Sequence, residues 1–251
     1  VADWNNYRVR KLSAGNVLST FAGPGASGQT VIAANQSATA TILRPLSVTG
    51  DAAGNIYLSN YDNCKTLKII PSGVISNVAG TLNSCGFTDN VAATSGHMYN
   101  PYQVAVAADG TIYIAHYSNG RIRQVPASGP NAGKIVTFAG GAAQTGTDAQ
   151  KATLSGPTGV AIDSATGDVY IATYNEHRVY RVTQAGAIAV IAGTGVSGFN
   201  GDQADATLAQ LYNPYFLSVS GNYLYVGDSS NNRIPRIQIN VNPRPIDTVA
   251  G

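Results

Sequence analysis

The sequence has few charged residues and few of the side chains that enzymes commonly use as metal ligands or acids. Charged residues make up 11% of the 251 residues, and the chain has 3 histidines and 2 cysteines. An average soluble domain carries about 25% charged residues. The net charge of +2 provides no electrostatic excess with which to hold a phosphate backbone. A strongly basic nucleic-acid binder is therefore not indicated.

Long apolar runs are also missing, and none approaches the roughly 18 residues of a membrane span. Two cysteines are too few for a disulfide framework but enough for one bridge. What the chain does have is 28 glycines, 11 prolines and 14 tyrosines, with 44% hydrophobic residues. This composition favours many tight turns around a sizeable core and argues against a helical bundle.

One sequence block recurs four times in nearly the same order. It begins with Pro-x-x-Val and a turn, continues with an Ile-Tyr-Ile core and Asn-x-Arg, and ends with Ala-Gly. The prolines recur every 56 or 57 residues, at Pro45, Pro101, Pro157 and Pro214, and the tyrosines follow at nearly the same period, at Tyr57, Tyr113, Tyr170 and Tyr225. Such a period is typical of a repeat architecture.

Each repeat contains four short runs of β-favouring residues separated by Gly, Asp, Asn and Pro. In one repeat the runs are 158–162, 169–173, 178–182 and 188–192. We call the four strands a, b, c and d, from the inside outward. Four antiparallel strands per repeat, with no helical periodicity between them, predict an all-β fold built of β-propeller blades.

The segment from Ala192 to Asp202 reads Ala-Gly-Thr-Gly-Val-Ser-Gly-Phe-Asn-Gly-Asp, and Leu211-Tyr212-Asn213-Pro214 follows it. These motifs resemble the NHL-repeat family of β-propellers in its long form, with repeats of about 56 residues. The resemblance covers the whole chain and implies a single propeller domain over residues 1–251. It says little about activity, because propellers serve many functions.

The first blade looks incomplete in the sequence. Val1-Ala2-Asp3 matches Val226-Gly227-Asp228 at the end of a strand b, so we expect only strands c and d in the first blade. The expected blades are 1–23, 45–80, 101–140, 157–193 and 214–251, which makes 4.5 blades. A propeller closes to leave no raw edge. If the family's common six-bladed ring applies, the chain is a segment of a longer one, or a neighbouring chain supplies the missing strands.

Alternation of antiparallel strands places the b–c turns and the long d–a loops on one face, which we call the long-loop face. These loops are 24–44, 81–100, 141–156 and 194–213. The a–b turns, such as 51–55, and the c–d hairpins, such as 184–186, lie on the opposite, short-loop face. Loops on a rigid scaffold often carry recognition residues, so a binding surface is expected on the long-loop face.

Two features favour an oxidising compartment. Cys64 begins a strand c and Cys85 lies just beyond strand d of the same blade, so a disulfide between them is expected on the long-loop face. Asn35-Gln36-Ser37 is an N-glycosylation sequon in a long loop. Together they predict an extracellular or cell-surface glycoprotein.

Eleven of the 15 lysines and arginines fall in the strand-c motifs. RNA-binding NHL propellers present basic surfaces, and this gives one interpretation of the pattern. The basic motif occurs once per blade, and this favours a structural interpretation in which the side chains bond loop carbonyls and aspartates. We therefore predict no nucleic-acid partner.

Five polar residues end strand b, and they are Asp3, Asn60, His116, Thr173 and Asp228. They are candidates for a ring at the mouth of the channel, where oxygen ligands suit a cation such as Ca²⁺. Turn capping is the favoured interpretation, so no metal, cofactor or catalytic residue is predicted. A catalytic Zn²⁺ needs three close ligands, and His97 and His177 occupy ordinary loop positions. The only glutamate is Glu176, and no Gly-x-Ser-x-Gly elbow occurs.

Aromatic residues also repeat on the expected long-loop face. They flank the repeat prolines or follow strand b, as Tyr99, Tyr102, Tyr212 and Tyr215, and Trp4, Tyr61, Tyr117 and Tyr174. Exposed Tyr and Trp suit stacking on sugars or docking on another protein. Their repetition favours packing between blades as the alternative.

The function that these patterns favour is a non-catalytic extracellular or cell-surface module. Its expected partners are a protein or glycan surface, or copies of itself joined through incomplete blades in a larger glycoprotein array or filament. The alternative is a propeller enzyme, a lyase or hydrolase with a metal in its central channel. RNA binding by the propeller ranks third.

Overall fold

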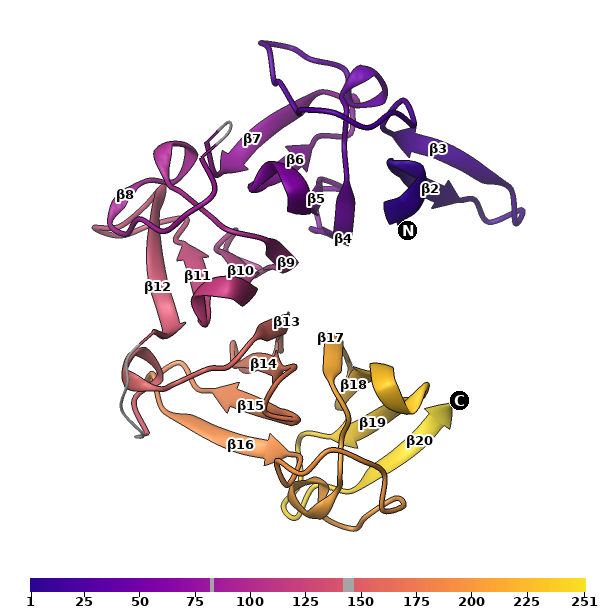
Figure 1. Ribbon diagram of the computed structural model, residues 1–251, viewed down its shortest axis with the longest axis vertical. Helices are drawn as coiled ribbons and strands as arrows, with labels where there is room; N and C mark the ends of the chain where they lie inside the picture. The colour runs from indigo at the N-terminus through magenta and orange to yellow at the C-terminus, as the bar shows by residue number, and fades with distance from the viewer. Residues whose placement is uncertain (82–83, 142–146) are drawn as a thin grey trace. The chain divides into compact units, whose positions relative to one another are not determined.

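The computed structural model describes residues 1–81, 84–141 and 147–251, and the regular structure of these residues consists of β-strands and three-residue 3₁₀ helices (Figure 1). The strands form five antiparallel sheets, which we call blades 1 to 5. None of the helices in these residues has the length and apolar character needed to cross a membrane.

The blades follow one another along the chain. Blade 1 holds β1 (Ala2–Asp3), β2 (Arg8–Leu12) and β3 (Leu18–Ala22), and blade 2 holds β4 (Pro45–Gly50), β5 (Ile56–Asn60), β6 (Lys65–Ile69) and β7 (Ile75–Ala79). Blade 3 holds β9 (Pro101–Val106), β10 (Ile112–His116), β11 (Arg121–Val125) and β12 (Lys134–Gly140), with β8 (Val91–Ala92) as an extra outer strand. Blade 4 holds β13 (Pro157–Ile162), β14 (Val169–Thr173), β15 (Arg178–Val182) and β16 (Ile188–Ala192), and blade 5 holds β17 (Pro214–Ser220), β18 (Tyr223–Asp228), β19 (Ile234–Gln238) and β20 (Ile246–Ala250).

Residue contacts divide the chain into two compact units. Unit 1 comprises Val1–Ile114 and Gln124–Val136, and unit 2 comprises Ala115–Arg123 and Thr137–Gly251. Blades 1 and 2 belong to unit 1, and blades 4 and 5 belong to unit 2. Each unit is described by itself below.

The short strand β1 corrects the blade count expected from the sequence. Ala2 pairs with Val9 and Asp3 with Arg8, so residues 1–23 form three strands rather than two. The described chain therefore forms five blades, in place of the 4.5 counted from the sequence and of the six expected for the ring. The sequence comparison had matched Val1–Asp3 to the end of a strand b, but it expected only strands c and d in this blade.

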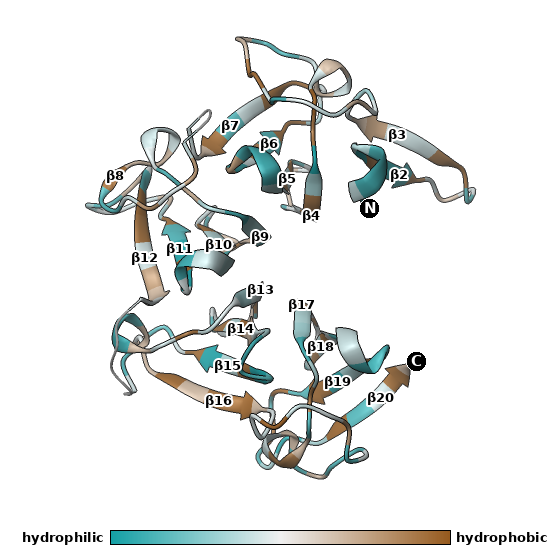
Figure 2. Ribbon diagram, viewed as in Figure 1, coloured by the Kyte–Doolittle hydropathy of each residue, from teal (hydrophilic) through white to brown (hydrophobic). Residues whose placement is uncertain are grey.

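The strands of blade 4 agree with the sequence prediction. Three of the four begin and end at the predicted residues, and β13 begins one residue earlier, at Pro157. Residues of β14 pair in register with all five residues of β15. In Figure 2 the third strands of the blades, β6, β11 and β15, are hydrophilic, whereas the outer strand β16 is mostly hydrophobic. The repeated basic motif on strand c accounts for this difference.

Each long loop pairs with the outer strand of the blade that follows it. The pairs are Ser37 with Val74, Val91 with Ile135, Asp148 with Ala187 and Gln203 with Ile246. In blade 3 this contact is long enough to form β8. An outer strand otherwise presents unpaired backbone groups that invite association. The long loops therefore cover the outer edges of blades 2 to 5.

The Ala-Gly motif at the end of strand d has a steric cause. The glycines Gly23, Gly80, Gly140, Gly193 and Gly251 all have φ between 85° and 108°. A Cβ on any of them would overlap the carbonyl oxygen of the residue that precedes strand c. Those residues, Tyr7, Cys64, Gly120, His177 and Asn232, are themselves left-handed, with φ of 53° to 58°. Glycine is required because only it combines this φ with so close an approach.

Hydrophobic cores fill the space between neighbouring blades within each unit. In unit 1 one core includes Leu43, Leu58 and Leu67, all at 0% exposure. In unit 2 the main core joins Tyr170 and Val179 of blade 4 to Leu224 of blade 5. These cores pack blade 1 against blade 2 and blade 4 against blade 5.

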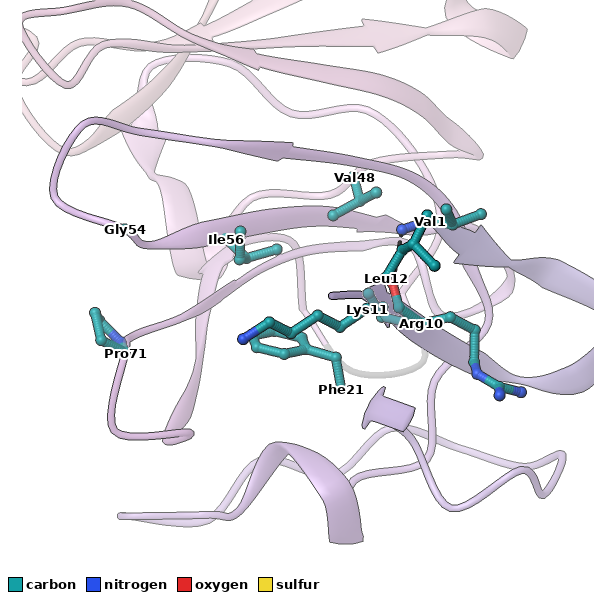
Figure 3. A pocket seen from close by; sticks show the side chains of 10 residues that line it. Val1, Arg10, Lys11, Leu12, Phe21, Val48, Gly54, Ile56 and Pro71 are labelled. Carbon is teal, nitrogen blue, oxygen red and sulfur yellow. Dashed lines mark hydrogen bonds between the residues drawn. The ribbon is translucent and has the colours of Figure 1, made fainter. Parts of the chain in front are cut away.

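Blade 1 differs from the others because its strand b is short. Val1 and Arg10 exchange backbone hydrogen bonds of 2.8 Å, and Lys11 and Leu12 pair with Ser19 and Leu18 of β3. An apolar cavity of about 520 Å³ lies beside these strands, and its lining includes Leu12, Phe21 and Ile56 (Figure 3). Leu12 is 58% exposed.

Candidate functional site

The basic residues of strand c bind the long loops. In three blades a guanidinium donates to the carbonyl oxygen of the residue after the Ala-Gly motif, at 3.0 to 3.2 Å, from Arg8 to Pro24, Arg121 to Gly141 and Arg178 to Thr194. In blade 2 the Nζ of Lys65 donates to the carbonyl oxygen of Thr30 at 3.0 Å, and burial lowers the pKa of Lys65. In blade 5 Arg233 pairs with Asp228 at 2.8 Å. The prediction that these side chains bond loop carbonyls and aspartates is confirmed.

The five residues proposed for a channel-mouth ring all end a strand b, as predicted. Four of them, Asn60, His116, Thr173 and Asp228, have 0% exposure, and Asp3 is half-buried. Asp3 and Asn60 belong to unit 1, and the other three belong to unit 2. Their place around a channel stays a prediction.

The side chains of these residues hold backbone groups of the long loops and turns. The Oδ1 of Asn60 accepts from the backbone N–H of Arg44 at 2.6 Å. The Oδ1 of Asp228 accepts from the backbone N–H of Tyr212, also at 2.6 Å. In both blades the end of the incoming loop is fixed by the last residue of strand b. Neither side chain caps the 3₁₀ turn that follows it, so the turn-capping role favoured by the sequence is not the one that these two residues have.

The remaining three residues bond within their own b–c turns. Asp3 accepts from Nδ2 of Asn6 at 2.9 Å, and Thr173 donates to the carbonyl oxygen of Arg178 at 3.2 Å. The Nε2 of His116 lies 2.9 Å from Nδ2 of Asn119. Burial, together with the positive charges of Arg123 and Arg121, lowers the pKa of His116 to about 3. His116 is therefore neutral at pH 7.

No three His, Cys, Asp or Glu side chains lie close enough together to hold a metal ion within residues 1–81, 84–141 and 147–251. The other two histidines take part in loop contacts. Nε2 of His97 lies 3.1 Å from Oγ of Ser84. Nδ1 of His177 accepts from the backbone N–H of Asn213 at 3.2 Å. Both lie in or beside the long loops, as their sequence positions predicted.

The predicted disulfide between Cys64 and Cys85 is present, with Cα atoms 5.4 Å apart. It ties the start of strand c in blade 2 to the following long loop. The sequon residue Asn35 is exposed and left-handed, with φ of 56°. An exposed loop asparagine is accessible to a glycosylating enzyme, and its modification stays a prediction.

Aromatic side chains form a ladder on the long-loop face of unit 1. The ring centroids of Trp4 and Tyr61 are 5.0 Å apart, and those of Tyr61 and Tyr102 are 5.3 Å apart. The guanidinium carbon of Arg44 lies 4.6 Å from the ring centroid of Trp4, and Arg44 also pairs with Asp62. All three rings are half-buried, so they pack on one another and still keep accessible surface.

A second ladder lies on the long-loop face of unit 2. Tyr117 and Tyr174 are 6.4 Å apart, Tyr174 and Tyr215 are 6.1 Å apart, and Tyr215 and Phe216 are 4.6 Å apart, all edge to face. Tyr212, which packs near His177, is 40% exposed. The sequence offered packing and docking as alternatives for these residues. The geometry is compatible with packing and with docking, because the rings contact each other along their edges and remain half-buried.

Solved structures resemble this fold at low sequence identity. One is an auxiliary nutrient binding protein from Bacteroides thetaiotaomicron, with TM-score 0.63 and 14% identity over 97% of this chain and 54% of its own. Another is virginiamycin B lyase from Staphylococcus aureus, with TM-score 0.55 and 14% identity over 98% of this chain and 78% of its own. A third is a chain of a nidogen/laminin complex, with TM-score 0.54 and 13% identity over 98% of this chain and 91% of its own.

The fold is a β-propeller. At these identities the likeness shows the fold alone. The chain spans about half the length of the first structures that it matches, which include a streptogramin B lyase of which it covers 54%. No family model matches the sequence, and no curated protein matches it.

Sequence reasoning missed a polar cavity on the short-loop face of the propeller in unit 2. Its lining includes Tyr170 and Arg181 of blade 4 and Arg244 of blade 5. The signal that could have found it is the c–d connection 239–245 of blade 5, which is longer and richer in Asn and Arg than the hairpin 184–186. The sequence had favoured the long-loop face for binding.

Proposed function

We propose that this protein is an extracellular, non-catalytic propeller of the NHL type that binds a neutral glycan on the aromatic ladders of its long-loop face. The observation that carries the proposal is the pair of ladders, in which half-buried Tyr and Trp rings form continuous strips. Such rings combine an apolar face with a polar tip, which suits a sugar ring with its apolar face and hydroxyl rim.

Three further observations support this function. The disulfide Cys64–Cys85 fits an oxidising compartment, and the exposed Asn35 fits a glycosylated surface. Strand-c arginines of blades 1, 4 and 5 donate hydrogen bonds to loop carbonyls and to an aspartate, so the protein itself uses donors that a ligand would otherwise meet. The fold is also shared with proteins described as auxiliary nutrient binding proteins.

The test is a titration of the whole chain with neutral oligosaccharides, followed by isothermal calorimetry. Tyr174 is the middle ring of the unit 2 ladder, so Tyr174→Ala is expected to weaken binding roughly tenfold or more, as for a central aromatic contact. Tyr223→Ala is the matched control, because Tyr223 is half-buried but lies outside both ladders. Equal affinities for the two variants, or no binding of any neutral glycan by the parent protein, would contradict the proposal.

We propose self-assembly through blade 1 as a second candidate function, because the β2–β3 hairpin exposes two leucines. Leu12 and Leu18 are 58% and 52% exposed, and Leu12 lines the apolar cavity of Figure 3. Two copies packing identical hairpins would form a two-fold symmetric contact. In analytical ultracentrifugation, Leu12→Glu is expected to abolish a dimer that Leu208→Glu, at a leucine 60% exposed in unit 2, leaves intact. A parent protein that stays monomeric at all concentrations would exclude this function.

A further inference from the structure

The polar cavity of unit 2 has a volume of about 520 Å³, within the range of about 300–1,000 Å³ typical of small-molecule sites. Three connections on the short-loop face line it. They are the a–b turn of blade 4 from Asp163 to Asp168, the a–b turn of blade 5 at Gly221 and Asn222, and the c–d connection of blade 5 from Ile239 to Arg244. The cavity is thus on the face opposite the aromatic ladders.

Tyr170 provides the first indication that the cavity receives a ligand. It is 2% exposed, it lines the cavity, and its hydroxyl has no hydrogen bond to any described residue. Two of the three equivalent tyrosines bond protein groups, whereas Tyr225 is half-buried and, like Tyr170, makes no hydrogen bond with the described residues. The hydroxyl of Tyr57 donates to Asp51 at 3.2 Å, and that of Tyr113 accepts from Gln124 at 3.1 Å. Because Tyr170 lines the cavity, a ligand there can supply the hydrogen-bond partner that the described residues do not.

Burial raises the pKa of Tyr170 to about 12. Asp163 and Asp168 raise it, while Arg181 and Arg244 lower it. The phenol therefore keeps its proton at neutral pH. It can donate a hydrogen bond to a ligand oxygen and accept one from a ligand hydroxyl.

Arg244 provides the second indication. It lines the cavity, its guanidinium makes no hydrogen bond or ion pair with the residues that the structure describes, and its Nε is buried without a partner. The other arginines of blade 5 are paired, Arg233 with Asp228 and Arg236 with Asp247. Within the described part of this blade, Arg244 is thus the arginine that lacks a carboxylate.

The acidic residues of the cavity are already engaged elsewhere. Asp168 pairs with Arg181, whose Nε lies 2.6 Å from the carboxylate. Asp163 accepts from the backbone N–H of Ala165 and from the hydroxyl of Thr166, both at 2.9 Å. Neither carboxylate contacts Arg244, so the unpaired positive charge can bind a carboxylate in the fork geometry that a guanidinium offers.

The remaining polar lining suits hydroxyl groups. Asn222, Asn240 and Asn242 each contribute a side-chain amide with both donors and acceptors. We propose that this cavity binds a small, polyhydroxylated carboxylate of the acidic-sugar class, with its carboxylate on Arg244 and a hydroxyl on Tyr170. This site is separate from the aromatic ladders and does not depend on the function proposed for them.

The test uses D-glucuronate as the probe and D-glucose as its neutral match, because the two differ only in the carboxylate at C6. Binding to the whole chain is measured by isothermal calorimetry and NMR shifts. Glucuronate is expected to bind about tenfold more tightly than glucose, the effect of one charge-assisted hydrogen bond. Acetate and inorganic phosphate are titrated separately, and both are expected to bind more weakly than glucuronate because they lack the hydroxyls.

Two variants locate the site. Arg244→Gln is expected to weaken glucuronate binding about 10- to 100-fold, and Tyr170→Phe about 3- to 10-fold. Arg236→Gln and Tyr57→Phe are the matched controls, since neither residue lines the cavity, and both should leave binding unchanged. Tyr170→Phe removes no hydrogen bond to the protein, so it tests the site even if Arg244→Gln is unstable.

Four results would overturn the proposal. They are no glucuronate binding at millimolar concentration, equal affinity for glucuronate and glucose, acetate or phosphate binding as tight as glucuronate, and unchanged affinity in Tyr170→Phe. The third result would identify a simple anion site in place of a sugar-acid site.

Discussion

The long-loop face and the short-loop face differ in what their connections do. On the long-loop face the connections are long, and their backbone groups bond strand-c cations and strand-b polar residues. On the short-loop face the connections are mostly tight turns, and in unit 2 three of them line a cavity that Tyr170 and Arg244 also line. Loop length thus indicates a structural role on one face, and a cavity with polar lining indicates binding on the other.

The largest expected loss of stability comes from replacing one glycine at the base of a long loop. Gly193→Ala would place a Cβ against the carbonyl oxygen of His177 at a φ of 90°, and we expect a loss of about 3 kcal/mol of unfolding free energy. The control is Gly186→Ala on the short-loop face, where φ is 83° but nothing lies within 4 Å. It should cost only the left-handed strain, about 1 kcal/mol. Urea unfolding measures both, and equal losses would refute the steric account.

The disulfide gives the next effect. Replacing both Cys64 and Cys85 with Ala is expected to lower the unfolding free energy by about 3 kcal/mol, because the bridge closes a loop with a sequence separation of 21 residues. Chemical reduction of the parent protein should have the same effect, and it should leave the double variant unchanged. A double variant as stable as the parent would show that the long-loop face does not depend on this link.

His116 makes the stability of the long-loop face depend on pH. Its folded-state pKa of about 3 lies below the ordinary value of 6.5, so between these values the unfolded state takes up a proton that the folded state does not. The contribution is fully present above about pH 6.5 and is lost as the pH falls toward 3, by up to about 1.4 kcal/mol per unit.

His116→Asn isolates this effect, because asparagine stands at the equivalent position of blade 2 as Asn60. Unfolding free energies of parent and variant, measured between pH 7 and pH 4, should differ by an amount that changes with pH. Parallel curves would show that His116 is not kept neutral by its surroundings.

The smallest effect compares two tyrosines on the short-loop side. Tyr57→Phe removes the hydrogen bond to Asp51 and is expected to cost about 1 kcal/mol. Tyr170→Phe removes a hydroxyl with no partner among the described residues, so its cost should be close to zero or the change should stabilise the fold. Thermal unfolding of the two variants and the parent protein measures the two losses of stability. Equal losses would mean that Tyr170 has a protein partner in solution.

Much of the fold could be predicted because each blade repeats the same physical requirements. The strand bounds of blade 4, the disulfide and the loop contacts of the strand-c cations depend on residues close in the repeat. The pairing of loops with the next outer strand was not predictable, since it joins residues of different repeats that share no sequence signal. Val1–Asp3 was matched to the end of a strand b, but the pairing of its two strand residues with β2 was not expected.

The candidate sites also divide into one that the sequence repeat predicted and one that it did not. The aromatic residues were found because they recur at fixed repeat positions, and the structure adds that they contact one another in two ladders. The polar cavity depends on three connections of blades 4 and 5 and on Arg244 in the longest of them. A repeat comparison looks for what the copies share, whereas this cavity depends on a connection that only blade 5 has in this form.

The left-handed residue before strand c has a consequence for engineering. Its side chain meets the long loop in different ways from blade to blade, as a covalent bond at Cys64 and as a hydrogen bond at His177. The backbone shape at this position is the same in all five blades. Side chains that bond the loop with different strengths can therefore be exchanged at this position without changing the backbone of the sheet. An engineered disulfide to one of the other long loops would be placed there first.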